Sequence, residues 1–331
     1  MGGVTVEKEY RYDAERELSD ALDKRRGWVQ FAYDPAGRVL SALHEATGRE
    51  ERFRYDAAGN HGRDDEPREY GPGGRLLRCG AITYAWDEAG RLREKREGAK
   101  LWQYTWDAAG RLAGVEVPDG RRAAYAYDPL GRRVEARLLA GRKVEERTRF
   151  VWDGDLLAHA IRTRATASAD PVVEERTYCF EDGGFVPWAH CEAGPDGYGG
   201  RQKSWAFYVN DAIGTPEELI DGAGGVLAEL DREVWGTTVA AEGARASTPL
   251  RFQGQQEDGE TGLSYNPQQS AFTAVKKGQR PHTMAEHDQI ASEALLAGNV
   301  PPDEAAALVA QSKQNLLNQG VTAPTRIPWK R

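Results

Sequence analysis

Aromatic and β-branched residues alternate with polar residues along much of the chain, and most alternating runs stop at an aspartate. Val29, Phe31 and Tyr33 lie on one side of such a run, and residues 102–106 show the same alternation with Trp, Tyr and Trp. Alternation with a period of two is typical of a half-buried β-strand. The pattern therefore predicts a mainly β protein in which each run is one strand.

A turn motif follows the runs: an aromatic residue, then Asp, then Gly three positions later, usually with Arg after it. Asp at the first turn position can accept a hydrogen bond from the backbone N–H two residues on, and Gly can adopt a positive φ. The Arg side chain is long enough to lie over a neighbouring strand and pair with a carboxylate. The clear copies of the motif are Tyr33, Asp34, Gly37, Arg38; Tyr55, Asp56, Gly59; Trp86, Asp87, Gly90, Arg91; Trp106, Asp107, Gly110, Arg111; and Tyr127, Asp128, Gly131, Arg132.

An internal repeat of this kind fixes the architecture, because each copy is one supersecondary unit. The unit is too short for a four-stranded propeller blade of about 40–45 residues, so each repeat is predicted to be a β-hairpin. We interpret the repeated aromatic, Asp, Gly and Arg residues as structural. The alternative is an aromatic surface that binds carbohydrate, which requires the tryptophans Trp86, Trp102, Trp106 and Trp152 to be exposed.

The composition narrows the possible functions. The net charge of −8 argues against non-specific binding of nucleic acid by the repeats. The sequence contains no apolar run long enough to span a membrane, and its start lacks a secretory signal. We therefore expect a cytoplasmic location in the producing cell and any export to proceed without a cleavable signal peptide. Cys79, Cys179 and Cys191 form no metal-binding spacing and are interpreted as reduced thiols, although Cys179 and Cys191 could pair. No cofactor or metal is predicted.

The sequence pattern divides at about residue 160. The clear hairpin repeats occupy residues 1–160, Thr163–Asp170 is predicted to be a loop, and residues 161–266 carry two longer motif blocks. The first block has Asn-Asp-x-x-Gly-Thr-Pro and then Trp-Gly, and the second has Arg-Phe-Gln-Gly and then Glu-Thr-Gly-Leu-x-Tyr-Asn. Their residues are Asp211, Gly214, Thr215, Pro216, Trp235, Gly236, Arg251, Phe252, Gln253, Gly254, Glu260, Thr261, Gly262, Leu263, Tyr265 and Asn266.

Together the repeats and the two blocks resemble the Rhs/YD-repeat family, and the blocks resemble its Rhs core region. The resemblance implies a spiralling shell of β-hairpins, which in bacterial polymorphic toxins encloses a variable C-terminal toxin. It further implies interbacterial competition, delivery by contact-dependent or type VI secretion, and a cognate immunity protein. The remainder of an Rhs shell, from an upstream chain, or an encapsulated tip would be a partner.

The sequence departs from this family in two ways. Family shells are much longer, so we expect residues 1–266 to supply only the last turns of a shell. In addition, Tyr265-Asn266 is followed at once by Pro267, and the downstream aspartates linked to self-cleavage in the family are absent. No autoproteolytic role is therefore transferred to any residue.

Residues 267–331 differ in composition from the rest of the chain and are predicted to form a small helical tail or tip. Helices are expected at Ala285–Ala297 and from Pro301 to about Asn318, ending near Gly320. Three tail residues are the only set that could perform chemistry, as metal ligands or acid and base: His282, Glu286 and His287. Their H-x-x-x-E-H spacing matches neither common zinc-protease motif, so a solvated helix start is the simpler interpretation.

Three functions therefore remain open. The leading hypothesis is a structural shell segment carrying a variable tip in interbacterial competition, without enzymatic activity in residues 1–266. The second is that the tail is itself a small, nuclease-like toxin. The third is a carbohydrate-binding surface module.

Overall fold

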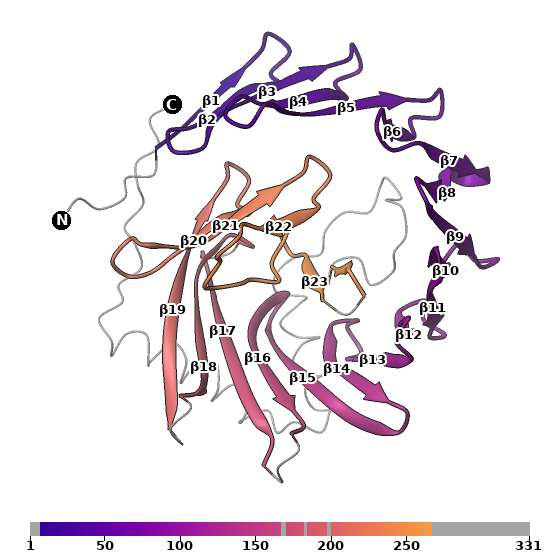
Figure 1. Cartoon of the computed structure of the whole chain (residues 1–331), viewed down its shortest axis with the longest axis vertical. Helices are drawn as coiled ribbons and strands as arrows, with labels where there is room; N and C mark the ends of the chain where they lie inside the picture. The colour runs from indigo at the N-terminus through magenta and orange to yellow at the C-terminus, as the bar shows by residue number, and fades with distance from the viewer. Residues whose placement is uncertain (1–6, 167–169, 182–183, 197–199, 260, 267–331) are drawn as a thin grey trace.

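A computed structural model describes residues 7–166, 170–181, 184–196, 200–259 and 261–266. Its strands follow one another in sequence order around a curved wall, and within each sheet neighbouring strands are antiparallel (Figure 1). The six strands of the first sheet are β1 (Lys8–Tyr12), β2 (Leu18–Asp23), β3 (Gly27–Tyr33), β4 (Val39–His44), β5 (Arg49–Tyr55) and β6 (His61–Arg63).

A second sheet of sixteen strands continues the same wall. Its strands are β7 (Arg68–Gly71), β8 (Arg75–Cys79), β9 (Ile82–Trp86), β10 (Leu92–Glu97), β11 (Lys100–Trp106), β12 (Leu112–Glu116), β13 (Arg121–Tyr127), β14 (Arg133–Ala140), β15 (Lys143–Asp153), β16 (Leu156–Arg164), β17 (Val172–Phe180), β18 (Pro187–Pro195), β19 (Arg201–Asn210), β20 (Pro216–Ile220), β21 (Val226–Arg232) and β22 (Thr238–Ala240). β23 (Gln256–Asp258) and β24 (Leu263–Tyr265) form a separate pair.

The mainly β prediction is confirmed. The described residues contain no α-helix, and a short 3₁₀ turn, η1 (Pro72–Gly74), separates β7 from β8. Accordingly, none of their elements is a helix that could cross a membrane. The two expected helices lie in residues 267–331, outside the described part of the chain.

Strand β16 contains two positions at which the sequence pattern changes. Residue 160 lies inside β16, so the sheet continues across the point where the sequence pattern changes. The loop predicted from Thr163 is wrong at its start, because β16 continues to Arg164, which pairs with Val172 of β17. The small polar side chains in this stretch did not prevent pairing, since the backbone ladder forms with most residue types.

The curvature of the wall has a local cause in the repeat. Tyr33 pairs with Val39, whereas its neighbour Ala32 pairs with Ser41, so one residue is bulged between them. The same shift in register precedes Trp106, Tyr127 and Trp152. A β-bulge bends its strand and increases the local twist. Repeating it at successive hairpins turns a flat meander into a curved strip.

The buried core lies on the inner face of the strip, where the last described segment covers it. One cluster contains Leu157, Tyr178, Ala206, Tyr208, Leu219, Ala228 and Leu250. A second contains Tyr104, Leu112, Val115, Val117, Ala123 and Tyr125, with Leu263 packed against it. Residues from the final segment thus contribute to both clusters, so this segment gives the inner face of the sheet an apolar partner.

Candidate functional site: a charged seam that closes the wall

The turn of each repeat is built around its aspartate. Asp34 Oδ1 accepts hydrogen bonds from the backbone N–H groups of Ala36 and Arg38, and Oδ2 accepts one from Arg38 Nε at 2.7 Å. These bonds from Arg38 and then from Ala36 hold the pKa of Asp34 below its usual range. Gly37 has a φ of 74°, which confirms the predicted positive-φ position. The arginine therefore pairs with its own turn, which corrects the expectation of a carboxylate on a neighbouring strand.

The same arginine contacts the next repeat through its guanidinium face. Arg38 lies 4.5 Å from the ring centroid of Tyr55, and Arg111 lies 5.1 Å from that of Tyr127. Such cation–π contacts are worth about 0.5–1 kcal/mol at exposed sites. In the copy at Asp56 the position of the arginine is taken by Asn60, whose Nδ2 donates to Asp56 Oδ2 at 2.8 Å. Asn60 thus keeps the hydrogen bond to the turn aspartate, but its side chain supplies no cation for the aromatic ring of the next repeat.

The repeated aromatics lock successive hairpins together. Each donates a hydrogen bond from its polar tip to the carbonyl of a residue just after the preceding turn. The donor and acceptor pairs are Tyr33–Leu18, Tyr55–Val39, Trp86–Leu76, Trp106–Leu92, Tyr127–Leu112 and Trp152–Arg133, at 2.8 to 2.9 Å. These bonds join each hairpin to the preceding one, so the repeated aromatics take part in the packing of the wall.

The first sheet meets the last strands of the second sheet along a line of ion pairs, which we call the seam. The cations come from the first sheet and its turns, and the carboxylates come from β20, β21 and the residue that follows β21. The pairs are Lys8–Glu217, Arg25–Glu218, Arg25–Glu229, Arg49–Asp231 and Arg63–Glu233. Segments about two hundred residues apart are thereby joined, so the wall returns to its own beginning (Figure 1).

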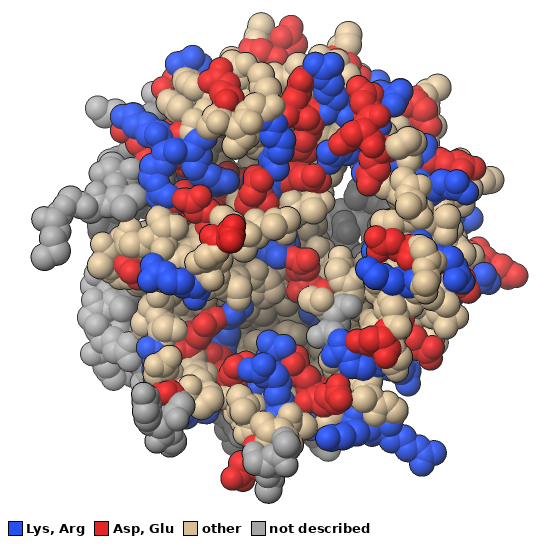
Figure 2. Space-filling model, in the orientation of Figure 1, with Lys and Arg blue, Asp and Glu red and all other residues tan. Residues whose placement is uncertain are grey.

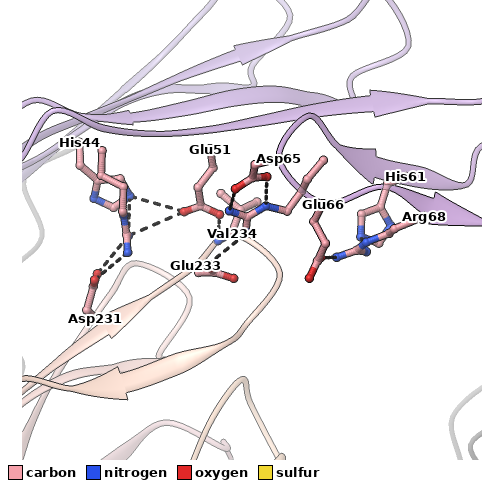
Figure 3. A network of polar contacts seen from close by, with 11 residues as sticks. His44, Glu51, His61, Asp65, Glu66, Arg68, Asp231, Glu233 and Val234 are labelled. Carbon is pink, nitrogen blue, oxygen red and sulfur yellow. Dashed lines mark hydrogen bonds and ion pairs between the residues drawn. The ribbon is translucent and has the colours of Figure 1, made fainter. Parts of the chain in front are cut away.

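A network around Glu51 forms the centre of the seam (Figure 3). Arg49 donates to both carboxylate oxygens of Asp231, at 2.7 and 3.1 Å. Glu51, of which only 2% is exposed, accepts a hydrogen bond from the backbone N–H of Val234 at 3.2 Å. Its carboxylate also lies 3.7 Å from Arg49 and from His44. The bidentate geometry of the Arg49–Asp231 pair gives it directional specificity in addition to charge attraction.

The seam extends to both sides of this network. On one side Arg25 Nη1 donates to Glu218 at 2.9 Å, and Lys8 Nζ donates to the carbonyl of Asn210 at 3.0 Å. Glu218 is only 1% exposed, and its burial raises its pKa, an effect that the Arg25 cation opposes. A buried carboxylate of this kind requires its cation, because an unpaired charge is costly away from water.

On the other side an aromatic contact supports the charges. Arg63 bonds Glu233 at 3.0 Å, and the ring of Trp235 stacks on His61 with centroids 4.5 Å apart. Trp235 also meets Phe53 edge to face at 6.0 Å. Burial, followed by the nearby Arg68 cation, lowers the pKa of His61. A neutral imidazole is therefore favoured against the indole face.

An inner anchor holds the final described segment against the repeats. The Arg133 guanidinium lies 4.7 Å from the ring of Tyr265 and 2.9 Å from the Asp258 carboxylate. The backbone N–H of Arg133 donates to the Tyr265 hydroxyl, which in turn donates to the Gly131 carbonyl at 3.1 Å. Phe150 also faces the Arg133 cation at 4.8 Å. This cage ties the Tyr-Asn end of the second motif block to a turn of the repeats.

The structure brings the two predicted motif blocks together. Gln253 donates to the Ile213 carbonyl, and a Cβ on Gly236 would meet the ring of Phe252 at 2.6 Å. Arg232 links the blocks further, since it pairs with Asp211 at 2.5 Å and lies over Phe252. These residues therefore form a packed structural junction. Glu260, His282, Glu286 and His287 lie outside the described residues, so the tail prediction stays a prediction.

The described residues contain no group of three or more His, Cys, Asp or Glu side chains placed to hold a metal ion. Cys79, Cys179 and Cys191 are free thiols, and burial raises the pKa of each. His190 is buried, with its Nδ1 2.7 Å from the Tyr208 hydroxyl. Burial, with a contribution from Arg176, lowers the pKa of His190 to about 3, so this histidine is neutral.

Two further observations bear on possible ligands. The four tryptophans required for a carbohydrate surface are half-buried, and three of them use their indole N–H within the wall. Acidic and basic side chains are interspersed over the face shown in Figure 2, without a patch of one sign. The carbohydrate hypothesis required these tryptophans to be exposed, and they are half-buried. The face shown in Figure 2 has no continuous basic surface of the kind that binds a nucleic acid.

The residues of the seam were missed by sequence reasoning. Arg49 and Asp231 are 182 residues apart and belong to no motif, so nothing in either local pattern signals that they meet. The only sequence signal is the alternation of charge on strands, which is common on exposed sheet faces. Which Arg or Lys pairs with which Asp or Glu across the seam depends on where the two strands lie in the curved wall.

Comparison with known proteins agrees with this architecture. The sequence matches the family described as Teneurin YD-shell over residues 6–146. It is 34% identical to double-stranded DNA deaminase toxin A of Burkholderia cenocepacia, over 80% of this chain and 20% of that protein. It is 31% identical to toxin protein Tse5 of Pseudomonas aeruginosa, over 80% of this chain and 24% of that protein. The chain thus spans about a fifth to a quarter of the length of these relatives.

A solved structure shares the fold. The crystal structure of TcdB2-TccC3-TEV superposes with a TM-score of 0.50 at 13% identity, covering 80% of this chain and 15% of that one. The hairpin strip, the repeat turns, the two motif blocks and these matches all point to one family. The chain belongs to the Rhs/YD-repeat family.

Proposed function

We propose that this chain is a structural segment of the shell of a polymorphic toxin and acts in competition between bacteria. In this proposal residues 1–266 form part of the shell wall, and residues 267–331 are the variable tip that the wall carries. The seam supports this proposal most strongly, because a wall that bends back and closes on itself separates an inner face from an outer one. The remainder of a shell, an immunity protein and a secretion apparatus are the partners that belong to such a function.

The chemistry of the described residues favours a container over a catalyst. The recurring geometry of the repeats is used for hydrogen bonds between hairpins, as the bond from Tyr127 to the Leu112 carbonyl illustrates. Buried titratable groups such as Glu51 and Glu218 are used in the seam. Two relatives of the chain carry the word toxin in their names, and the chain matches only a part of the length of each relative. The matched part is, in our proposal, the shared wall.

Protease protection tests this function. A wall that encloses its tip should shield residues 267–331 in the full chain, and opening the seam should remove the shield. We expect trypsin to cut the tail slowly in the native chain and at least about tenfold faster in Arg49→Asp, which places a carboxylate opposite Asp231. Arg52→Asp is the matched control, because Arg52 lies on the same strand and pairs only with the nearby Glu50 among the described residues. Equal cleavage of the tail in all three proteins would contradict the proposal.

A second candidate function is an enzymatic toxin in the tail. It is favoured by one observation, that a relative at 34% identity is named as a DNA deaminase toxin. The test is growth of a susceptible bacterium that expresses the full chain, the chain with His282→Ala and His287→Ala, or the chain ended after Asn266. Growth arrest that needs the two histidines would support an enzyme. Arrest without them would indicate a non-catalytic toxin, and equal growth in all three strains would contradict the second candidate.

A further inference from the structure

A break in the backbone hydrogen bonding divides the wall after β6. β6 pairs with β5, and β7 pairs with β8, but no ladder joins β6 to β7 in the described part of the chain. Residues 64–67 connect the two strands without regular structure, and Asp64, Asp65 and Pro67 are exposed. A few residues outside regular elements can absorb a large change in φ and ψ, which is what a hinge requires. The first sheet can therefore turn relative to the second at residues 64–67.

Side chains, rather than the backbone ladder, bridge this break. Tyr70 of β7 donates from its hydroxyl to the His61 carbonyl at 2.6 Å, so the hydrogen bond of the repeat aromatics is kept where the ladder is absent. Arg68 contacts the ring of the same His61 and pairs with Glu66 at 3.1 Å (Figure 3). Because a ladder adds many backbone hydrogen bonds together, rotation at this break is easier than separation of two paired strands.

The seam is the other contact between the two sheets, and among the described residues it too contains no ladder. It follows one rim of the first sheet from β6 to β1, through Arg63, Arg49, Arg25 and Lys8 in that order. β6 lies beside the break, and β1 lies five strands further along the sheet, which at the usual strand spacing is about 24 Å away. A rotation about residues 64–67 therefore moves Lys8 and Arg25 much further than Arg63.

We propose that residues 64–67 are a hinge and that the first sheet, residues 8–63, rotates about it as one body to open the wall. The ion pairs of Lys8 and Arg25 with β20 and β21 hold the sheet closed, because they lie furthest from the hinge and have the longest lever arm. Every strand of the first sheet keeps its ladder during this motion. The inference rests on the proposed function, since it supplies the way in which a container opens.

Arg25 is the residue whose replacement should open the wall most. Its guanidinium bonds Glu218 and Glu229, each at 2.9 Å, and Glu218 is only 1% exposed. Arg25→Asp replaces the cation of both pairs with a carboxylate, so like charges then face each other across the seam. Arg25 lies between β2 and β3, so the substitution leaves the strands of the first sheet unchanged.

Distances between pairs of spin labels in the full chain, measured by pulsed electron paramagnetic resonance, test the proposal. One pair joins Tyr12 on β1 to Ile213, which lies in the turn after β19; these side chains are 59% and 58% exposed. A second pair joins Arg52 on β5 to the exposed Val239 on β22. A third pair, Tyr12 and Arg52, lies within the first sheet. The labels are attached to encoded residues other than cysteine, because the native chain has free thiols.

Each pair is measured in the native chain, in Arg25→Asp and in a matched control. The control is Arg78→Asp, which makes the same change of charge within the second sheet, where Arg78 pairs only with Glu69 among the described residues. The native chain is also measured at about 1 M sodium chloride, which screens exposed ion pairs without any substitution. The salt measurement decides the matter if Arg25→Asp does not fold.

We expect the distance from Tyr12 to Ile213 to lengthen in Arg25→Asp and in salt. The increase should be at least about threefold larger than for Arg52 and Val239, because β1 lies about five strand spacings from the break and β5 about one. The distance from Tyr12 to Arg52 should stay constant, and the control variant should match the native chain throughout.

Three results would overturn the proposal. Equal lengthening at both ends of the seam would mean that the first sheet lifts away without a hinge. A broadened distance between Tyr12 and Arg52 would mean that the first sheet unfolds. Native distances in both Arg25→Asp and concentrated salt would mean that the wall does not open at the seam.

Failure of the hinge and failure of the proposed function are distinguishable, because the label distances involve no residue of the tail. If the distances change as expected but trypsin cuts the tail equally in the native chain and in Arg49→Asp, the hinge stands and the container role is lost. If tail protection depends on Arg49 while the distance from Tyr12 to Ile213 never changes, the container role stands and the hinge is lost.

Discussion

At the scale of single residues, the aromatic position of the repeat accepts Tyr and Trp for one physical reason. Both side chains have an apolar body that packs against the strand and a polar hydrogen at the far end. Tyr127 and Trp106 use that hydrogen in the same way, each on a backbone carbonyl 2.8 Å away. Phenylalanine would supply the body without the hydrogen. This explains why either residue type can occupy this position in the motif copies.

The first prediction concerns that hydrogen. Tyr127→Phe leaves the Leu112 carbonyl without its side-chain donor and should lower the free energy of unfolding by about 1 kcal/mol. Urea denaturation of the full chain measures the change. Tyr12→Phe is the matched control, because the exposed Tyr12 makes no such bond among the described residues. Equal losses in the two variants would show that the bond to the carbonyl is not what stabilises the repeat.

The second prediction concerns the turn glycine. Gly131 has a φ of 86°, where a Cβ crowds the following carbonyl, so Gly131→Ala should cost about 1–2 kcal/mol. Gly62 is a suitable comparison, since its φ is not in the left-handed region and a Cβ there would meet Arg54 only at 3.9 Å. Thermal unfolding of both alanine variants decides the matter. A midpoint for Gly131→Ala equal to that of Gly62→Ala would refute the strain.

At the scale of elements, two kinds of contact hold the wall together. Neighbouring hairpins are joined by the backbone ladder and the aromatic lock, whereas the final segment is held on the inner face by a few buried side chains. Arg133 is the centre of the second kind, because it contacts Asp258 and Tyr265. The attachment of β23 and β24 should accordingly depend on single residues more than the wall does.

The third prediction follows from this difference. Arg133→Met keeps much of the length of the side chain but removes the cation beside the mostly buried Asp258 carboxylate, at a cost of about 3–5 kcal/mol. Amide exchange in residues 256–265 should accelerate while exchange in β9 and β10 stays as in the native chain. Adding Asp258→Asn should restore part of the loss, because it removes the negative charge that Arg133 neutralises in the native chain. A double variant as unstable as Arg133→Met would contradict the ion-pair explanation.

The fourth prediction concerns pH. Because the pKa of His190 is about 3 when folded and 6.5 for an unperturbed histidine, the unfolded chain binds a proton between these values that the folded chain does not. Stability therefore falls as the pH falls from 6.5 toward 3, by up to about 1.4 kcal/mol per pH unit from this residue. His190→Gln should flatten the slope of unfolding free energy against pH. The pKa values of His61 and His159 are also lowered, so some slope should remain. An unchanged slope in the variant would refute the assignment.

At the scale of the whole molecule, the sequence predicted the units of the wall but not its closure. The strands ending at Tyr33 and Tyr127 and the positive φ of Gly131 follow from local patterns, since turn and strand chemistry are set by nearby residues. The acceptor of each aromatic could not be predicted, because it depends on the bulge and the twist between neighbouring strands. The contacts of Glu51 with residues after β21 depend on the accumulated curvature of the entire strip.

Charge sorting across the seam is the property that distinguishes this molecule from an open strip of hairpins. Cations on the first sheet and its turns pair with carboxylates on β20 and β21, so the two sides of the seam attract each other. Exposed pairs contribute little singly, whereas the buried carboxylates of Glu51 and Glu218 make separation of the two sides costly. Closure is therefore the central claim about the fold.

Zero-length carbodiimide crosslinking of the full chain, read by mass spectrometry, tests closure most directly. The reagent joins an amine to a carboxylate only when the two are in contact. Lys8 and Glu217 form such a pair across the seam, and Lys24 and Glu7 form a local pair beside the ends of β1 and β2 that serves as the internal control. A closed wall predicts both crosslinks in monomeric protein, with the Lys8–Glu217 product reduced in Arg49→Asp. A monomer that yields the Lys24–Glu7 product but no Lys8–Glu217 product would show that the wall is open in solution.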